Sequence, residues 1–130
     1  MKHQRERFLP YGHQSITQKD IEAVNEVLTS ELITQGPLVQ RFENCVSERV
    51  HAKYGVAVNS ATSALHIACI SLGLGPGDWL WTSPITFVAS ANCAKYCSAY
   101  VDFVDIDPET GLISMNSLKE KLEDARLKNK

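Results

Sequence analysis

The sequence predicts an α/β fold with a mostly parallel sheet and flanking helices. Short apolar runs typical of strands, at residues 56–58, 79–82 and 100–106, alternate with helical patterns at 62–72 and 87–96. A last helix is marked by Leu118, Leu122 and Ala125. Strands that alternate with helices form parallel sheets with right-handed crossovers. Three strands are few for such a sheet, where about 4–6 are usual, so we expect a fragment or a truncated domain.

The composition narrows the possible classes of protein. The chain has 130 residues, of which 44% are hydrophobic and 22% charged, and its formal net charge is −2. This balance gives no reason to expect nucleic acid or an anionic membrane as a partner. No apolar run approaches the roughly 20 residues of a membrane span, and the charged start "MKHQRERFLPYG" lacks the apolar core of a signal peptide. We therefore expect a cytoplasmic protein.

The cysteines predict neither a metal site nor a disulfide framework. The four residues, which are Cys45, Cys69, Cys93 and Cys97, contain no CxxC pair. A structural zinc ion requires four ligands, whereas only Cys93 and Cys97 are spaced to share a helix face. Buried free thiols are the favoured interpretation.

The first part of the chain predicts two helices after an irregular lead-in over residues 1–16. Thr17 provides a hydroxyl cap and Asp20 an acid in the first turn of the first helix. The pattern breaks at residues 30–36. Pro37 suits the first position of a second helix, because its missing N–H is not needed there. Gly55 ends this block.

The most informative stretch is "NSATS", residues 59–63, where a predicted strand leads into a helix. In open α/β sheets, ligands bind at the carboxyl ends of the strands. The free N–H groups and the dipole of a helix N-terminus favour an anion there, and the hydroxyls of Ser60, Thr62 and Ser63 can donate to a phosphate. The alternative is a plain helix cap, for which serine and threonine are favoured locally. The residues leave both interpretations open.

A second candidate lies at the next strand-to-helix turn. Phe87, in "SPITFVASAN", is expected on the same edge as Thr62, where an aromatic ring can stack on a flat ligand. The alternative is a phenylalanine of the core. The chain contains no GxGxxG, P-loop or GxSxG pattern, so dinucleotide binding and serine hydrolysis have little support.

Four blocks of this sequence resemble the DegT/StrS-type sugar aminotransferases. They are "LITQGP", "VAVNSATSALHIACISLGLGPGD", "TSPITFVASANC" and "VDFVDIDPETG", and they follow the order and spacing of that family. The resemblance covers about residues 9–122 and implies the N-terminal third of a pyridoxal 5'-phosphate (PLP) enzyme with the aspartate-aminotransferase fold. The opening "LPYGHQSITQKDI" is most similar to UDP-4-amino-4,6-dideoxy-N-acetyl-β-L-altrosamine transaminases of pseudaminic acid synthesis.

The resemblance also implies roles for particular residues. Ala61 and Thr62 would hold the phosphate of PLP, and Phe87 would stack on its pyridine ring. The substrate-binding site would be lined by Ala61 together with Tyr11, Glu31, Leu32, Ile33 and Thr34. The family's reaction takes an amino group from glutamate and passes it to C4 of a UDP-linked 4-keto-6-deoxy-N-acetylhexosamine. Family members are homodimers, so the resemblance implies a homodimer or another form of self-association.

The sequence also departs from the family pattern. Family members need a lysine that binds the cofactor covalently and an aspartate at the pyridine nitrogen, and both lie beyond the matched region. We therefore expect residues 17–130 to form part of a large PLP-binding domain, with no catalytic residue, no metal site and no small C-terminal domain. The chain alone would be inactive. The alternative is a non-catalytic phosphate-binding or protein-interaction module derived from this fold.

Overall fold

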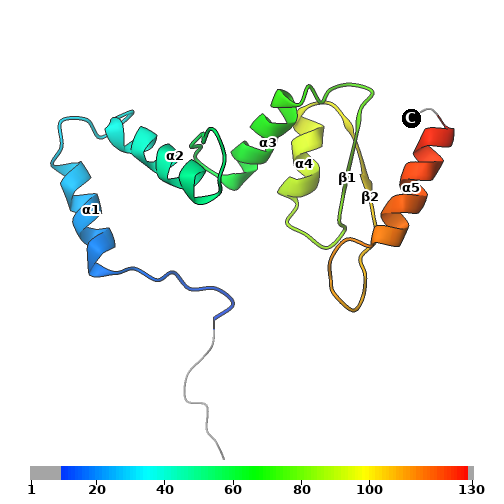
Figure 1. Ribbon diagram of the computed structural model, residues 1–130, viewed down its shortest axis with the longest axis horizontal. Coiled ribbons are helices and arrows are strands. Elements are labelled where there is room, and N and C mark those ends of the chain that lie inside the picture. Colours follow the sequence, from blue (N-terminus) through cyan, green and yellow to red (C-terminus); the bar gives the residue numbers. More distant parts are fainter. Residues whose placement is uncertain (1–9, 129–130) are drawn as a thin grey trace, which may run out of the picture. The chain divides into compact units, whose positions relative to one another are not determined.

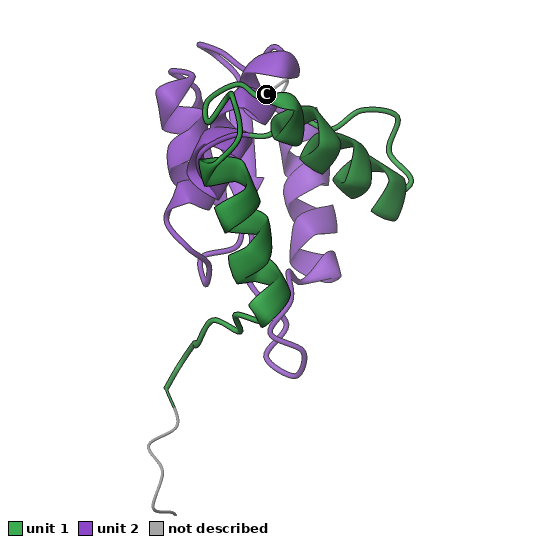
Figure 2. Cartoon of the chain, turned by 90° about the vertical axis from the view of Figure 1, so that its left-hand side faces the viewer, with its two compact units in different colours: residues 1–57 green, residues 58–130 purple. Residues whose placement is uncertain are grey.

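The structure, a computed structural model, describes residues 10–128 and divides the chain into two compact units. Unit 1 spans residues 1–57 and unit 2 spans residues 58–130 (Figure 2). In the described residues, no helix is long and apolar enough to cross a membrane.

From residue 10 onward, unit 1 contains two helices, α1 (Gln18–Leu28) and α2 (Pro37–Arg49). Both begin where the sequence predicts. The Thr17 N–H and hydroxyl donate to the Asp20 carboxylate at 2.6 and 2.7 Å, which satisfies a donor that would otherwise be free at the helix start. These bonds, the one from the Thr17 N–H first, lower the pKa of Asp20 from its usual value. Pro37 is the first residue of α2, as expected.

The end of unit 1 packs against α2 through a close backbone approach. A Cβ on Gly55 would lie 2.7 Å from the Glu43 carbonyl oxygen, and the Ala57 N–H donates to Glu43 Oε1 at 2.8 Å. The predicted buried strand at Val56–Val58 is wrong, because this segment is not a strand and Val56 is 76% exposed. The Ala57 N–H bonds to a side chain and not to a neighbouring strand.

Up to residue 128, unit 2 consists of a two-stranded parallel sheet and three helices. In chain order these are α3 (Ala61–Ser71), β1 (Trp79–Thr82), α4 (Ala89–Tyr96), β2 (Tyr100–Phe103) and α5 (Met115–Leu127). The register pairs Trp79 with Tyr100 and Thr82 with Phe103. The α/β class and the parallel pairing are confirmed, with α4 as the crossover between the two strands (Figure 1).

The core of unit 2 is centred on α4, which packs against α3 and against both strands. Ala89, Cys93 and Ala94 on α4 are at most 3% exposed, and Cys69 of α3 and Val104 after β2 are also buried. Most of these side chains are small, which lets the backbones of α3 and α4 approach closely. His66 and Tyr96 extend this contact, with ring centroids 5.2 Å apart.

Two predicted boundaries in unit 2 need correction. The helix predicted over 87–96 begins at Ala89, so Phe87 precedes it. The strand predicted over 100–106 ends at Phe103, and Ile106 forms only an isolated antiparallel bridge with Ile113. Helix α3 is apolar on most faces, yet among the described residues only its Cys69 is buried.

Helix α5 is attached to β2 mainly through Lys121. Its Nζ lies 2.6 Å from Asp102 Oδ2 and 2.6 Å from the Phe103 carbonyl oxygen, and 5.6 Å from the ring centroid of Trp81. The Lys121 side chain is 23% exposed, so its interactions are less screened than those of a free surface lysine. One cation thus joins the helix to the strand through both a side chain and a carbonyl.

Replacing Lys121 by methionine should lower the free energy of unfolding by about 1 kcal/mol, since a half-buried ion pair and a charge-assisted hydrogen bond are lost. The loss should shrink at high salt. Lys128→Met is the matched control, because its ion pair with Asp124 is exposed on both sides and contributes a few tenths of a kcal/mol at most. Urea unfolding measures both. Equal effects of the two variants would contradict the role given to Lys121.

The thiols differ in exposure more than the sequence predicts. Cys69 and Cys93 are buried, but Cys45 is exposed and Cys97 is half-buried. Burial, with smaller contributions from Cys93 and Cys97, raises the pKa of the Cys69 thiol to about 11. The prediction of four buried thiols is therefore wrong for Cys45, which lies on the exposed surface of α2.

Iodoacetamide at pH 8 should alkylate Cys45 first and leave Cys69 and Cys93 unmodified until the chain is unfolded in urea. The thiolate is the reactive form, so burial and a raised pKa both slow the reaction of Cys69. Mass spectrometry of timed samples measures the order. Labelling of Cys69 in the folded protein as fast as that of Cys45 would show that the α3–α4 contact is open.

Candidate functional site

The N-terminus of α3 is built by a short network of polar side chains. Ser60 is the N-cap, and its Oγ accepts a hydrogen bond from the Ser63 N–H at 3.2 Å. The Ser63 hydroxyl donates to Asn59 Oδ1 at 2.6 Å. The capping role expected of this stretch therefore falls on Ser60, and Ser63 is used within the network.

Ala61 and Thr62 are left outside this network. Within residues 10–128, neither N–H group donates to a protein acceptor, and the Thr62 hydroxyl has no partner. Thr62 itself is half-buried. Two main-chain donors and one hydroxyl are thus available at the positive end of a helix of 11 residues, an arrangement that favours an anion. No acidic residue lies in the first turn to compete for these donors.

This helix N-terminus lies at the carboxyl edge of the small sheet. In Figure 1, α3 and α4 both begin at the end of unit 2 where β1 ends, and the loop over residues 83–88 connects β1 to α4 at that end. The packing of α3 on α4 fixes this arrangement. Ligands of open α/β sheets bind at this edge, as the sequence predicts for the stretch at 59–63.

Phe87 belongs to the loop at the same edge. Its side chain is 74% exposed, so the alternative of a core phenylalanine is wrong for the described residues. Its carbonyl accepts from the Ser90 N–H at 3.0 Å, and the adjacent Thr86 and Ser90 hydroxyls lie 3.2 Å apart. These local bonds hold the loop while the aromatic ring stays free to contact a ligand.

The other candidate residues belong to unit 1. Tyr11 is exposed near the start of the described chain, and Glu31, Leu32, Ile33 and Thr34 lie exposed in the loop between α1 and α2. They thus belong to a different unit from Ala61, Thr62 and Phe87. Sequence reasoning named these positions but not the neighbouring residues that shape their loop.

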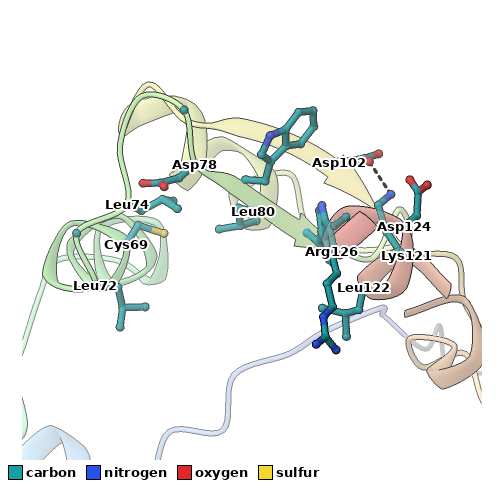
Figure 3. Close-up of a pocket in the computed structure, with 15 residues that line it drawn as sticks. Cys69, Leu72, Leu74, Asp78, Leu80, Asp102, Lys121, Leu122, Asp124 and Arg126 are labelled. Atoms are coloured by element: carbon teal, nitrogen blue, oxygen red, sulfur yellow. Dashed lines mark ion pairs between the residues drawn. The ribbon is translucent and has the colours of Figure 1, made fainter. Parts of the chain in front are cut away.

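Unit 2 also contains a groove that the sequence did not indicate. It has a volume of about 920 Å³ and lies between the C-terminal part of α3, β1 and α5 (Figure 3). Cys69 and Leu72 line one side, and Leu122 lines the other, next to the Lys121–Asp102 ion pair. Among residues 10–128, no group of three or more His, Cys, Asp or Glu side chains is arranged to hold a metal ion. The groove combines these apolar side chains with the charged side chains of Asp78, Asp102, Lys121, Asp124 and Arg126.

Two characterised relatives resemble the chain in sequence. The spore coat polysaccharide biosynthesis protein SpsC of Bacillus subtilis is 44% identical over 110 residues, which are 85% of this chain and 28% of that protein. A UDP-4-amino-4,6-dideoxy-N-acetyl-β-L-altrosamine transaminase of Campylobacter jejuni is 40% identical over 119 residues, which are 92% of this chain and 30% of that protein. The chain thus spans about three tenths of the length of these relatives.

Two solved structures resemble the chain in fold. The PLP form of Spr1654 from Streptococcus pneumoniae superposes with a TM-score of 0.81 at 30% identity, over 86% of this chain and 29% of that one. PseC of Helicobacter pylori, an aminotransferase involved in the biosynthesis of pseudaminic acid, gives a TM-score of 0.79 at 32% identity, over 85% of this chain and 30% of that one. These matches confirm a partial α/β fold of the kind found in PLP-dependent aminotransferases.

The profile of one family covers nearly the whole sequence, from residue 14 to residue 128. This match confirms the family that the four sequence blocks predict. The chain belongs to the DegT/DnrJ/EryC1/StrS aminotransferase family.

Proposed function

We propose that this chain supplies the phosphate cradle and the ring-stacking face of a PLP-dependent nucleotide-sugar aminotransferase. The reaction moves an amino group from glutamate to C4 of a UDP-linked 4-keto-6-deoxy-N-acetylhexosamine, in the pseudaminic acid pathway. The observation that carries the proposal is the free N–H pair of Ala61 and Thr62 at the start of α3, together with the exposed side chain of Phe87 in the loop that leads from β1 to α4. Family membership supports the amino transfer.

The residues present fit the phosphate of PLP. Ala61 and Thr62 would donate their N–H groups and Thr62 its hydroxyl, while the dipole of α3 adds favourable potential for a dianion. Ser60 and Ser63 support this indirectly, because their mutual bonds satisfy the next N–H of the helix. The short side chain of Ala61 leaves room for close approach of the ligand, and also for the substrate contact that the resemblance implies.

Phe87 fits the ring of the cofactor. Its exposed face can stack on the pyridine ring and exclude water from one side of it. PLP, when bound, supplies the electron sink for amino transfer, and the protein supplies orientation and electrostatics. The lysine and the aspartate that such enzymes need have no counterpart in residues 1–130, so this chain alone would contribute cofactor binding and no covalent step.

The sugar-binding side would come from unit 1, through Tyr11 and residues 31–34. Support for a UDP-linked substrate comes from the similarity to the Campylobacter jejuni transaminase, and support for the pseudaminic acid pathway comes from the similarity to Helicobacter pylori PseC. We also propose that residues 17–130 belong to a large PLP-binding domain, that the enzyme is a cytoplasmic homodimer, and that neither nucleic acid nor a membrane is a partner.

The complete reading frame that contains residues 1–130 should yield a protein that binds PLP and turns over glutamate repeatedly only when a 4-keto sugar nucleotide is present. With glutamate alone, the release of 2-oxoglutarate should stop at about one equivalent per bound PLP, because the cofactor then stays in its amine form. The two measurements are the absorption spectrum of the bound cofactor and the release of 2-oxoglutarate. A GDP-linked 4-keto-6-deoxy sugar serves as the competing substrate and should be a poorer acceptor. PLP binding without amino transfer would favour a non-catalytic phosphate-binding module, and absence of PLP binding would overturn the proposal.

Thr62→Val in that protein should weaken PLP binding by roughly one to two decades, since a hydrogen bond to a charged group contributes about 1.5–3 kcal/mol. The affinity for pyridoxal, which has no phosphate, should change little. Thr29→Val is the matched control, because the Thr29 hydroxyl bonds only to the carbonyls of its own helix. Equilibrium titration measures all three proteins. An equal loss of affinity for PLP and for pyridoxal would argue against a phosphate contact by Thr62.

A further inference from the structure

The loop between α1 and α2 is held by contacts that converge on one carbonyl. The Ser30 hydroxyl lies 2.7 Å from the Val27 carbonyl oxygen and 3.2 Å from that of Leu32. Gln35 adopts a left-handed conformation, with φ 53°, which turns the chain back toward α2. Leu32 belongs to the segment 31–34, which the proposed function assigns to the sugar substrate.

Gly36 also lies close to the Leu32 carbonyl. A Cβ added to Gly36 would be 2.8 Å from the Leu32 carbonyl oxygen and 3.4 Å from the Leu32 Cβ. The φ of Gly36 is −76°, which any residue adopts, so space and not backbone conformation excludes a side chain. The obstructing atom belongs to the backbone. Any larger residue at position 36 must therefore displace Leu32.

The loop presents main-chain donors rather than polar side chains at its centre. In the described chain, none of the N–H groups from Glu31 to Gly36 donates to a protein acceptor. Leu32 and Ile33 are 56% and 63% exposed, and their side chains cannot form hydrogen bonds. The donors that this segment offers to a polar ligand are therefore mostly peptide N–H groups, whose directions depend on the path of the backbone.

We propose that Ser30 and Gly36 are positioning residues for the sugar nucleotide. By fixing the Leu32 carbonyl between them, they set the directions of the N–H groups in segment 31–34, which donate to the oxygens of the UDP-linked substrate. This inference rests on the proposed function. It adds two residues that touch no substrate and act through the backbone of Leu32.

The first test compares Gly36→Ala with Gly75→Ala in the product of the complete reading frame. A Cβ on Gly75 meets nothing closer than 3.9 Å, at the Gly73 carbonyl oxygen, so this control adds the same methyl group without a clash. Gly36→Ala should weaken binding of UDP, measured by calorimetry, and raise KM for the sugar nucleotide, each at least about tenfold, since misplacement of about 1 Å is costly for oriented contacts. PLP affinity and the rate of the reaction with glutamate alone should stay unchanged.

Two substitutions at Ser30 provide a second test, which applies even if Gly36→Ala fails to fold. Ser30→Ala removes the hydroxyl that contacts the Leu32 carbonyl, whereas Ser30→Thr retains it. Ser30→Ala should raise KM for the sugar nucleotide several-fold with kcat nearly unchanged, and Ser30→Thr should restore the wild-type KM.

Unchanged UDP affinity in both Gly36→Ala and Ser30→Ala would overturn the inference while leaving the proposed function intact. A parallel loss of PLP affinity and glutamate reactivity would overturn it as well, because it would indicate a general effect on folding. If the wild-type protein binds neither PLP nor UDP, the proposed function fails and the inference fails with it.

Discussion

The contact between α3 and α4 is the constraint on which the candidate site depends. Small side chains on α4, chiefly Ala89, Cys93 and Ala94, let the two helices pack closely while α4 also covers both strands. Because β1 leads directly into α4 through a short loop, this packing holds the start of α3 near the end of β1. The free N–H groups of Ala61 and Thr62 are useful only because the helix is held in this place. A larger residue at position 94, where the side chain is fully buried, would move the site as well as strain the core.

The local signals in the sequence predicted most of the helix starts and turns. Thr17 with Asp20, Pro37 and Ser60 each act over three or four residues, so their effect does not depend on distant parts of the chain. The parallel pairing of β1 with β2 also followed from the order of elements, because a strand–helix–strand unit has one preferred connection. Phe87 follows β1, as the order of elements predicts, although the helix after it begins two residues later than predicted.

What the sequence failed to predict depends on contacts between distant segments. Val56–Val58 has strand-forming residues, but a strand exists only with a paired neighbour, and the Ala57 N–H bonds to Glu43 instead. Helix α3 is apolar on most faces, which indicates how much surface it can bury but not which partners cover it. The exposure of Cys45 was not predicted for the same reason, because the sequence does not show which segment covers its helix. Its helix has an apolar stripe, yet in the described chain the stripe is not covered.

Two glycines are required by close contacts with the backbone, which the sequence alone does not reveal. Gly36 and Gly55 both adopt conformations open to other residues, yet a Cβ on either would meet a carbonyl oxygen at 2.8 or 2.7 Å. Gly55 thereby fastens the end of unit 1 to α2, whereas Gly36 fixes the loop that precedes this helix. The first of these close approaches lies at the N-cap of α2, and the second lies at Glu43 in the middle of the helix. A substitution that merely lowers helix propensity on α2 would leave the loop over residues 31–34 in place, because that loop is fixed by Ser30 and Gly36 and not by the helix interior. Substitutions at Ser30 or Gly36 should therefore change the binding of the sugar nucleotide, whereas substitutions in the interior of α2 should change the free energy of unfolding.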